Sequence, residues 1–125
     1  MPLVADRVDI MKTAWTNEAF RREILTGAHE QVVVMTIPVD GEIGEEVHPD
    51  TDQVFVFLDG HGEAVLEGAT SVFAANDLLF VRAGTLHNIV NTGGSPLRLI
   101  TIYAPPQHAV GTVHMTREEA DAAEH

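Results

Sequence analysis

The sequence predicts an all-β protein, either a sandwich or a barrel, because turn signals recur at short intervals and β-forming segments lie between them. The turn signals include Asp40-Gly41, Asp59-Gly60 and Gly93-Gly94. Many short strands at such spacing are typical of these two all-β classes. The segments expected to form strands are Gln31–Pro38, Val54–Leu58, Glu63–Glu67, Ser71–Ala74, Leu78–Val81, Ile89–Asn91 and Leu97–Tyr103.

The length and composition indicate one domain with an ordinary core. A chain of 125 residues can bury such a core without cross-links. It contains no cysteine, which excludes disulfides, cysteine-ligated zinc and thiol nucleophiles. The sequence has no linker, repeat or low-complexity tract. We therefore expect a single domain over residues 1–125, with the barrel core at about residues 31–103.

The formal net charge of −12, with seven Lys and Arg residues, argues against two classes of partner. A nucleic-acid-binding protein needs a basic surface to meet phosphates, and the sequence has no basic cluster. No apolar run approaches the ~20 residues of a membrane span. Residues 1–10 also lack the apolar core of a signal peptide. We therefore expect a cytoplasmic protein that binds neither nucleic acid nor membrane.

The N-terminal segment before the barrel core fits two local structures. Residues 20–26 can belong to a helix that begins near Thr16 and runs through Leu25. They can equally form the first arm of a hairpin with Gln31–Ile37, across a turn that begins at Thr26. We favour the hairpin.

The C-terminal tail is expected to end in a short helix. Thr116 and Glu119 match a capping box, and Arg117–Glu124 is rich in residues with high helix propensity. His108 and His114 precede this helix, outside the barrel motifs. Structural packing, a subunit contact and a role near the pocket are the alternatives for these two histidines.

The strongest chemical signal lies between Glu46 and Gln53. Glu46 and His48 are two residues apart, so on one strand they point to the same face. Residues 49–52 fit a turn, because proline fixes φ and aspartate tolerates turn geometry. A hairpin of this kind brings Glu46, His48 and Gln53 together inside a barrel. His87, which follows a separate glycine-containing turn, is a fourth candidate.

These residues give the chain a resemblance to the cupin family. The first cupin motif has a histidine, a second histidine two residues later, a glutamate and then a glycine. The residues at these positions are Glu46, His48, Gln53 and Gly60. The second motif contains a glycine, a histidine and an asparagine whose spacing is matched by Gly84, His87 and Asn91.

The resemblance covers about residues 31–103 and implies a single cupin barrel, the double-stranded β-helix or jelly roll, followed by the short helix. It is most specific to small stand-alone cupins with the signature Gly-Glu-Glu-Val-His-Pro-Asp-Thr-Asp-Gln, found here at residues 44–53. Cupins commonly pair through strands at the barrel edge. The resemblance therefore also implies a homodimer.

Three positions depart from the usual cupin pattern. Glu46 replaces the usual first histidine, Gln53 the usual glutamate and Arg82 the usual proline. The set of Glu46, His48, Gln53 and His87 still holds two imidazoles and one carboxylate, with the formal charge of three histidines and one glutamate. The resemblance thus implies that these four residues bind Mn, Fe, Co, Ni or Zn, which suit mixed nitrogen and oxygen ligands. Four protein ligands leave two positions of an octahedral ion open.

The fold does not define a function, and three classes stay open, the third of which is a metal-free structural cupin. The first is a divalent-metal-dependent enzyme that acts on a small polar organic molecule. It would be an isomerase or lyase of a sugar-like acid, or a dioxygenase, with Glu46 as the catalytic residue that moves a proton. The alternative is a non-catalytic module that binds a metal or a small ligand. Metal-dependent turnover distinguishes the first two classes.

Overall fold

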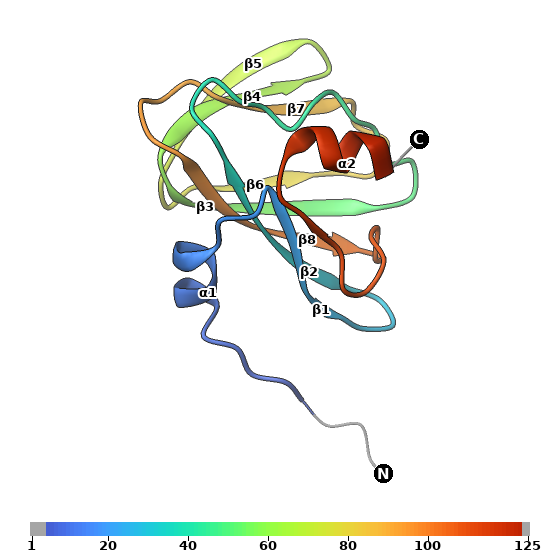
Figure 1. Cartoon of the computed structure of the whole chain (residues 1–125). Helices are drawn as coiled ribbons and strands as arrows, with labels where there is room; N and C mark the ends of the chain where they lie inside the picture. Colours follow the sequence, from blue (N-terminus) through green and yellow to red (C-terminus); the bar gives the residue numbers. More distant parts are fainter. Residues whose placement is uncertain (1–4, 124–125) are drawn as a thin grey trace.

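The protein has the all-β architecture that the sequence predicts, in a computed structural model that describes residues 5–123 (Figure 1). The strands are β1 (Arg21–Thr26), β2 (Gln31–Ile37), β3 (Asp52–Asp59), β4 (His61–Leu66), β5 (Ala69–Ala74), β6 (Leu78–Val81), β7 (His87–Asn91), β8 (Leu97–Ala104) and β9 (Val113–His114). The larger sheet has the order β6-β3-β8-β2-β1-β9, and the smaller sheet has the order β5-β4-β7. The two antiparallel sheets face each other across the core.

Alternating burial along the strands places one face of each sheet in the core. In β2, Val33, Met35 and Ile37 are at most 1% exposed, as the two-residue period of a strand requires. Phe57 of β3 stacks on Phe73 of β5 with ring centroids 3.7 Å apart, and this contact joins the two sheets. The alternation of apolar residues in the sequence therefore closes the barrel around one core.

The segment before the barrel forms a short helix and then a hairpin. β1 pairs with β2, with Arg21 opposite Met35, so the hairpin interpretation is confirmed and the helical alternative is wrong. The sequence did not predict α1 (Ile10–Thr16), because seven residues are too few to display a helical period. Ala14 of α1 is 1% exposed and packs with Val34 on the outer face of the larger sheet (Figure 1).

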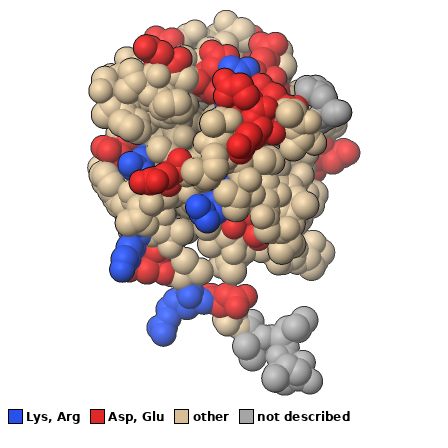
Figure 2. Space-filling model, viewed as in Figure 1, with Lys and Arg blue, Asp and Glu red and all other residues tan. Residues whose placement is uncertain are grey.

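The C-terminal tail ends in α2 (Arg117–Ala123), which confirms the expected helix. The two side chains of the expected capping box both cap this helix, although Glu119 reaches the N–H of Met115 and not that of Thr116. The N–H of Glu119 donates to Oγ1 of Thr116 at 3.2 Å, and the Glu119 carboxylate accepts from the N–H of Met115 at 2.6 Å. The expected last helical residue, Glu124, lies outside the described residues. Acidic side chains gather over α2 (Figure 2), two of them in its first turn, where the helix dipole favours them.

Both ends of the chain contribute strands to the larger sheet. β1 precedes the expected barrel core, and β9 follows it. The two strands pair with each other, with Arg21 opposite His114, at the edge of the sheet. This pairing brings the C-terminal tail back across the barrel. Among residues 5–123, no helix is long and apolar enough to cross a bilayer.

Candidate metal centre

Glu46 and His87 lie side by side because the segment between β2 and β3 runs along β7. The N–H of each residue donates to the carbonyl of the other at 2.9 Å. The expected hairpin between this segment and β3 is therefore wrong, since Glu46 bridges to the smaller sheet while Gln53 lies in the larger sheet. Gly44, with a φ of 106°, and Pro49 interrupt a regular strand here, so that only isolated bridges form.

Three of the expected ligand side chains converge between the sheets. Glu46, His48 and His87 each offer one ligand atom, and these atoms all lie within 4.8 Å of one another. The ring centroids of His48 and His87 are 5.6 Å apart. Metal–ligand bonds of about 2.0 to 2.2 Å separate two ligands of one ion by about 3 to 4 Å. The three side chains therefore lie close to the arrangement that a shared ion requires.

The ring of His87 is buried and is oriented by the turn before it. Nδ1 of His87 lies 2.9 Å from the carbonyl oxygen of Thr85. Because a carbonyl only accepts, Nδ1 carries the proton and Nε2 keeps the lone pair that a metal needs. The N–H of Gly84 in the same turn donates to the carbonyl of His48 at 2.9 Å. The backbones that carry the two histidines are thus tied together.

Glu46 lies among hydrogen-bonding and positively charged groups. Its Oε2 is 3.0 Å from Nε2 of His48, and its Oε1 is 4.0 Å from Nη2 of Arg21. Burial raises the pKa of the Glu46 carboxyl, but the hydrogen bond from His48 and the charges of Arg21 and the two histidines together hold that pKa below its usual value. The carboxylate is therefore ionised at neutral pH, as a metal ligand or a general base must be.

Gln53, the fourth expected ligand, has a buried amide oxygen. The residue is 2% exposed, and its Nε2 donates to Oγ1 of Thr101 at 2.9 Å. Its cross-strand neighbour Tyr103 has its ring centroid 6.0 Å from that of His48. Within residues 5–123, Oε1 of Gln53 accepts no hydrogen bond. A buried amide oxygen in that state suits a cation, so the donor set fits the metal that the sequence implies.

Arg21 was not expected from the sequence to belong to this centre. It is 2% exposed, and its guanidinium faces Glu46. Along the sequence nothing distinguishes it from Arg22, which is half-buried, because charged residues on strands are usually solvated. Arg21 is buried because β9 pairs with β1 at this position. The burial of Arg21 is therefore apparent only in the tertiary structure.

A cavity of about 550 Å³ adjoins the metal centre. Glu46 and His48 line one part of it, and the C-terminal tail lines another part with His108 and His114. The ring of His108 packs edge-on against Tyr103, with centroids 5.0 Å apart. Three alternatives were open for these two histidines, and in the structure both of them lie at the pocket.

The pKa of His108 leads to a prediction about acid stability. Burial, and after it the charge of Arg21, lower the pKa of this ring from 6.5 to about 4. The unfolded chain therefore takes up the proton at a higher pH than the folded protein, and the contribution of His108 to stability, complete above about pH 6.5, is lost as the pH falls toward 4.

We expect the His108→Ala variant, without metal, to lose less stability than the wild type between pH 7 and pH 4.5. The difference should be about 1 to 2 kcal/mol once solvent screening at this partly exposed ring is allowed for. Urea unfolding of both proteins at the two pH values measures it. Equal losses would contradict the expectation.

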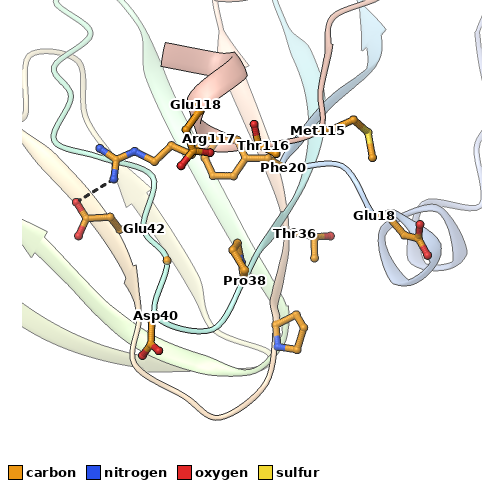
Figure 3. Close-up of a pocket in the computed structure, with 12 residues that line it drawn as sticks. Glu18, Phe20, Thr36, Pro38, Asp40, Glu42, Met115, Thr116, Arg117 and Glu118 are labelled. Carbon is orange, nitrogen blue, oxygen red and sulfur yellow. Dashed lines mark ion pairs between the residues drawn. The ribbon is translucent and has the colours of Figure 1, made fainter. Parts of the chain in front are cut away.

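A second cavity, of about 510 Å³, lies between β2 and the start of α2 (Figure 3). An ion pair between Arg117 and Glu42, with an N···O distance of 3.6 Å, lies in its lining. The lining includes Phe20 and Met115 but none of the four expected metal ligands. The candidate metal chemistry is therefore at the first cavity.

The barrel and the paired motifs define the class of protein. Residues 33–103 match the sequence model of the family described as Cupin domain. This match covers more than half of the chain and includes Glu46, His48, Gln53 and His87. The protein belongs to the cupin family, which confirms the resemblance.

Particular relatives extend the similarity beyond the family match. The chain is 40% identical over 123 residues to the Bacillus subtilis protein YrkC, an alignment that covers 94% of this chain and 66%, just under two thirds, of YrkC. The crystal structure of BH2720 from Bacillus halodurans is also 40% identical, with a TM-score of 0.90, and the match covers 98% of this chain and 95% of that chain. A predicted oxalate decarboxylase from Thermotoga maritima has a TM-score of 0.65 and 21% identity, over 69% of this chain and 79% of its own. The last similarity shows a shared fold alone.

Proposed function

We propose that this cupin binds one divalent transition metal, Mn, Fe, Co, Ni or Zn, and uses it to act on a small polar organic molecule. The observation that carries the proposal is the convergence of Glu46, His48 and His87, whose ligand atoms lie within 4.8 Å of one another. The buried Oε1 of Gln53 supplies a fourth donor. His87 lies in the smaller sheet and Gln53 in the larger sheet, while Glu46 and His48 lie in the segment between β2 and β3 that bridges to β7.

The chemistry of the donors favours a transition metal. Two imidazole nitrogens suit Mn, Fe, Co, Ni and Zn better than Ca or Mg, which prefer oxygen ligands throughout. His87 presents Nε2, because its Nδ1 donates to Thr85. Nε2 of His48 and Oε2 of Glu46 are hydrogen-bonded to each other at 3.0 Å. Both atoms would turn toward the ion when it binds. Binding would then release the proton that they share.

The reaction class follows from the groups around the cavity. A bound divalent ion supplies a Lewis acid for a carbonyl or carboxylate oxygen and, as Fe or Mn, redox capacity. Glu46 is ionised at neutral pH and can accept a proton from a substrate carbon or hydroxyl. Arg21 brings a buried positive charge that attracts an acid. These groups support isomerase or lyase chemistry on a sugar-like acid, or a dioxygenase.

Reconstitution tests the proposal. The purified protein is stripped with a chelator, reloaded separately with each of the five metals, and analysed for metal content. One metal per chain is expected. Sugar acids are then followed by NMR for isomerisation or elimination, and oxygen uptake is measured for the Fe and Mn forms. Turnover that disappears on chelation supports an enzyme. Stoichiometric metal without turnover favours the non-catalytic binding module, and failure to retain any of the five metals contradicts the proposal.

A further inference from the structure

The C-terminal tail forms a wall of the cavity, beside the proposed metal ligands. The tail residues that line this cavity, together with Glu46 and His48, are Gln107, His108, Ala109, Thr112, His114 and Ala123. Two of these six carry an imidazole. The tail therefore brings polar groups to the cavity in addition to Glu46 and His48.

The wall is held in place by a buried glutamine and by strand pairing. Gln31 is 0% exposed, and its Oε1 accepts from the N–H groups of Gln107 at 3.1 Å and His108 at 2.9 Å. Its Nε2 donates to the carbonyl of His108 at 2.7 Å. His114 lies in β9, opposite Arg21 of β1. A ligand that binds here does not have to order the tail first, which reduces the entropic cost of binding.

Each of the two imidazoles has a ring nitrogen whose hydrogen-bonding capacity is not used within the protein. Nε2 of His108 and Nδ1 of His114 are shielded from solvent and have no hydrogen-bond partner among residues 5–123. Buried polar atoms normally have partners. The rings themselves line the cavity, and a rotation about the Cβ–Cγ bond would turn these nitrogens toward a ligand inside it.

The charges around the cavity favour an anion as that ligand. Arg21 is buried with its guanidinium next to Glu46, whose carboxylate is ionised. Glu46 balances the charge of Arg21, so a divalent ion at the proposed site would leave the centre positive. The formal net charge of the chain is −12, so this interior contrasts with the acidic protein around it. A carboxylate reduces this positive charge and offers oxygens to N–H donors.

We infer that His108 and His114 form a recognition site for a small organic acid, in which the imidazole N–H groups donate to the acid's oxygen atoms. The inference rests on the proposed function insofar as the metal supplies part of the positive charge. A cavity of about 550 Å³ has the size of a small-molecule site. The substrate class of the proposed chemistry is therefore a short carboxylic acid with further oxygen atoms.

Calorimetric titration of the cobalt-loaded protein and of the chelator-treated protein tests this site. The probes are lactate, glycerate and oxalate, with lactamide as the uncharged counterpart of lactate. We expect at least one acid to bind the cobalt-loaded wild type. If lactate is that acid, lactamide should bind at least about 10-fold more weakly than lactate.

His108→Ala and His114→Ala should each weaken acid binding about 10-fold, which corresponds to about 1.4 kcal/mol, with cobalt content unchanged. His108→Asn, which keeps an N–H donor, should recover part of the affinity. His29→Ala removes an exposed histidine in a turn and should change nothing.

Four outcomes would overturn the recognition site. The first is that none of the three acids binds the wild type, and the second is that the wild type and both histidine variants bind acid with equal affinity. The third is that these variants lose cobalt. The fourth is that His29→Ala weakens acid binding as much as they do. Cobalt content is measured in the same samples, so failure of the proposed function is seen separately. If the wild type takes up neither cobalt nor any of the other four metals, the proposed function fails. Acid binding to the metal-free protein that depends on both histidines would still support the recognition site, and its absence would overturn it.

Discussion

Replacing His87 by alanine is expected to lower the affinity of the protein for Co²⁺ or Zn²⁺ by at least about 100-fold. Loss of a group that only orients a metal ligand already costs 10- to 100-fold, and His87 is proposed as a ligand itself. The residue is 3% exposed and is held by Thr85, so its place cannot be taken by a solvent-exposed histidine. Calorimetric titration and elemental analysis of the two purified proteins measure the change.

Two further variants sharpen this prediction. Gln53→Leu removes the amide oxygen and is expected to cost less, about 10-fold, because both imidazoles and the carboxylate remain. His61→Ala removes an exposed histidine of β4 and should bind metal like the wild type.

Metal at 100 times its Kd should also stabilise the wild type by about 2.7 kcal/mol, and it should stabilise His87→Ala far less. A His87→Ala protein with wild-type metal content and the same thermal gain would refute the metal site.

Replacing Gly62 by alanine is expected to reduce the free energy of unfolding by about 3 kcal/mol. A Cβ at Gly62 would lie closer than 3.0 Å to the carbonyl oxygen of Val90 and to the ring of Phe73. Val90 belongs to β7, which is paired with β4 along its length, so its backbone cannot move away without breaking that ladder. Overpacking in a rigid interior costs about 1 to 3 kcal/mol and occasionally more. Urea unfolding of both proteins measures the loss.

Gly94→Ala provides the matched control for this prediction. Gly94 has no atom within 4 Å of an added Cβ, and its φ is not in the left-handed region. We expect its stability to stay within about 0.5 kcal/mol of the wild type. Gly62→Ala and Gly94→Ala proteins of equal stability would show that the close approach of β4 to β7 is not a constraint. β7 also carries His87, so Gly62→Ala also tests how firmly the barrel holds this proposed metal ligand.

Most of the fold was predictable from the sequence because strands and turns are local patterns. The alternation in β2 and the spacing of the glycine turns predict strands whatever the tertiary structure. The capping box of Thr116 and Glu119 likewise acts within one turn of helix and predicted α2. By contrast, α1 is stabilised by packing of Ala14 on the larger sheet, and its seven residues carry too little periodicity to predict.

The candidate site was predictable in its residue types and only partly in its geometry. The resemblance to the cupin motifs implied that Glu46, His48 and His87 meet, and their ligand atoms do lie close together. The expected route, a hairpin between Glu46 and Gln53 on neighbouring strands, was wrong. Glu46 instead exchanges two backbone hydrogen bonds with His87. A motif specifies which donors gather, but many backbone paths bring them to the same point.

The sequence by itself determined the strand pattern, the donor types at Glu46, His48, Gln53 and His87, and the absence of cysteine chemistry. These properties depend on residue identity and on spacing within a few positions. Only the tertiary structure decided that Arg21 is buried against Glu46 and that the tail carries His108 to the cavity. The physical reason is that both depend on pairing between the two ends of the chain, where β9 joins β1. The burial and the charge of a group in such a contact come from its partners, which the local sequence does not name.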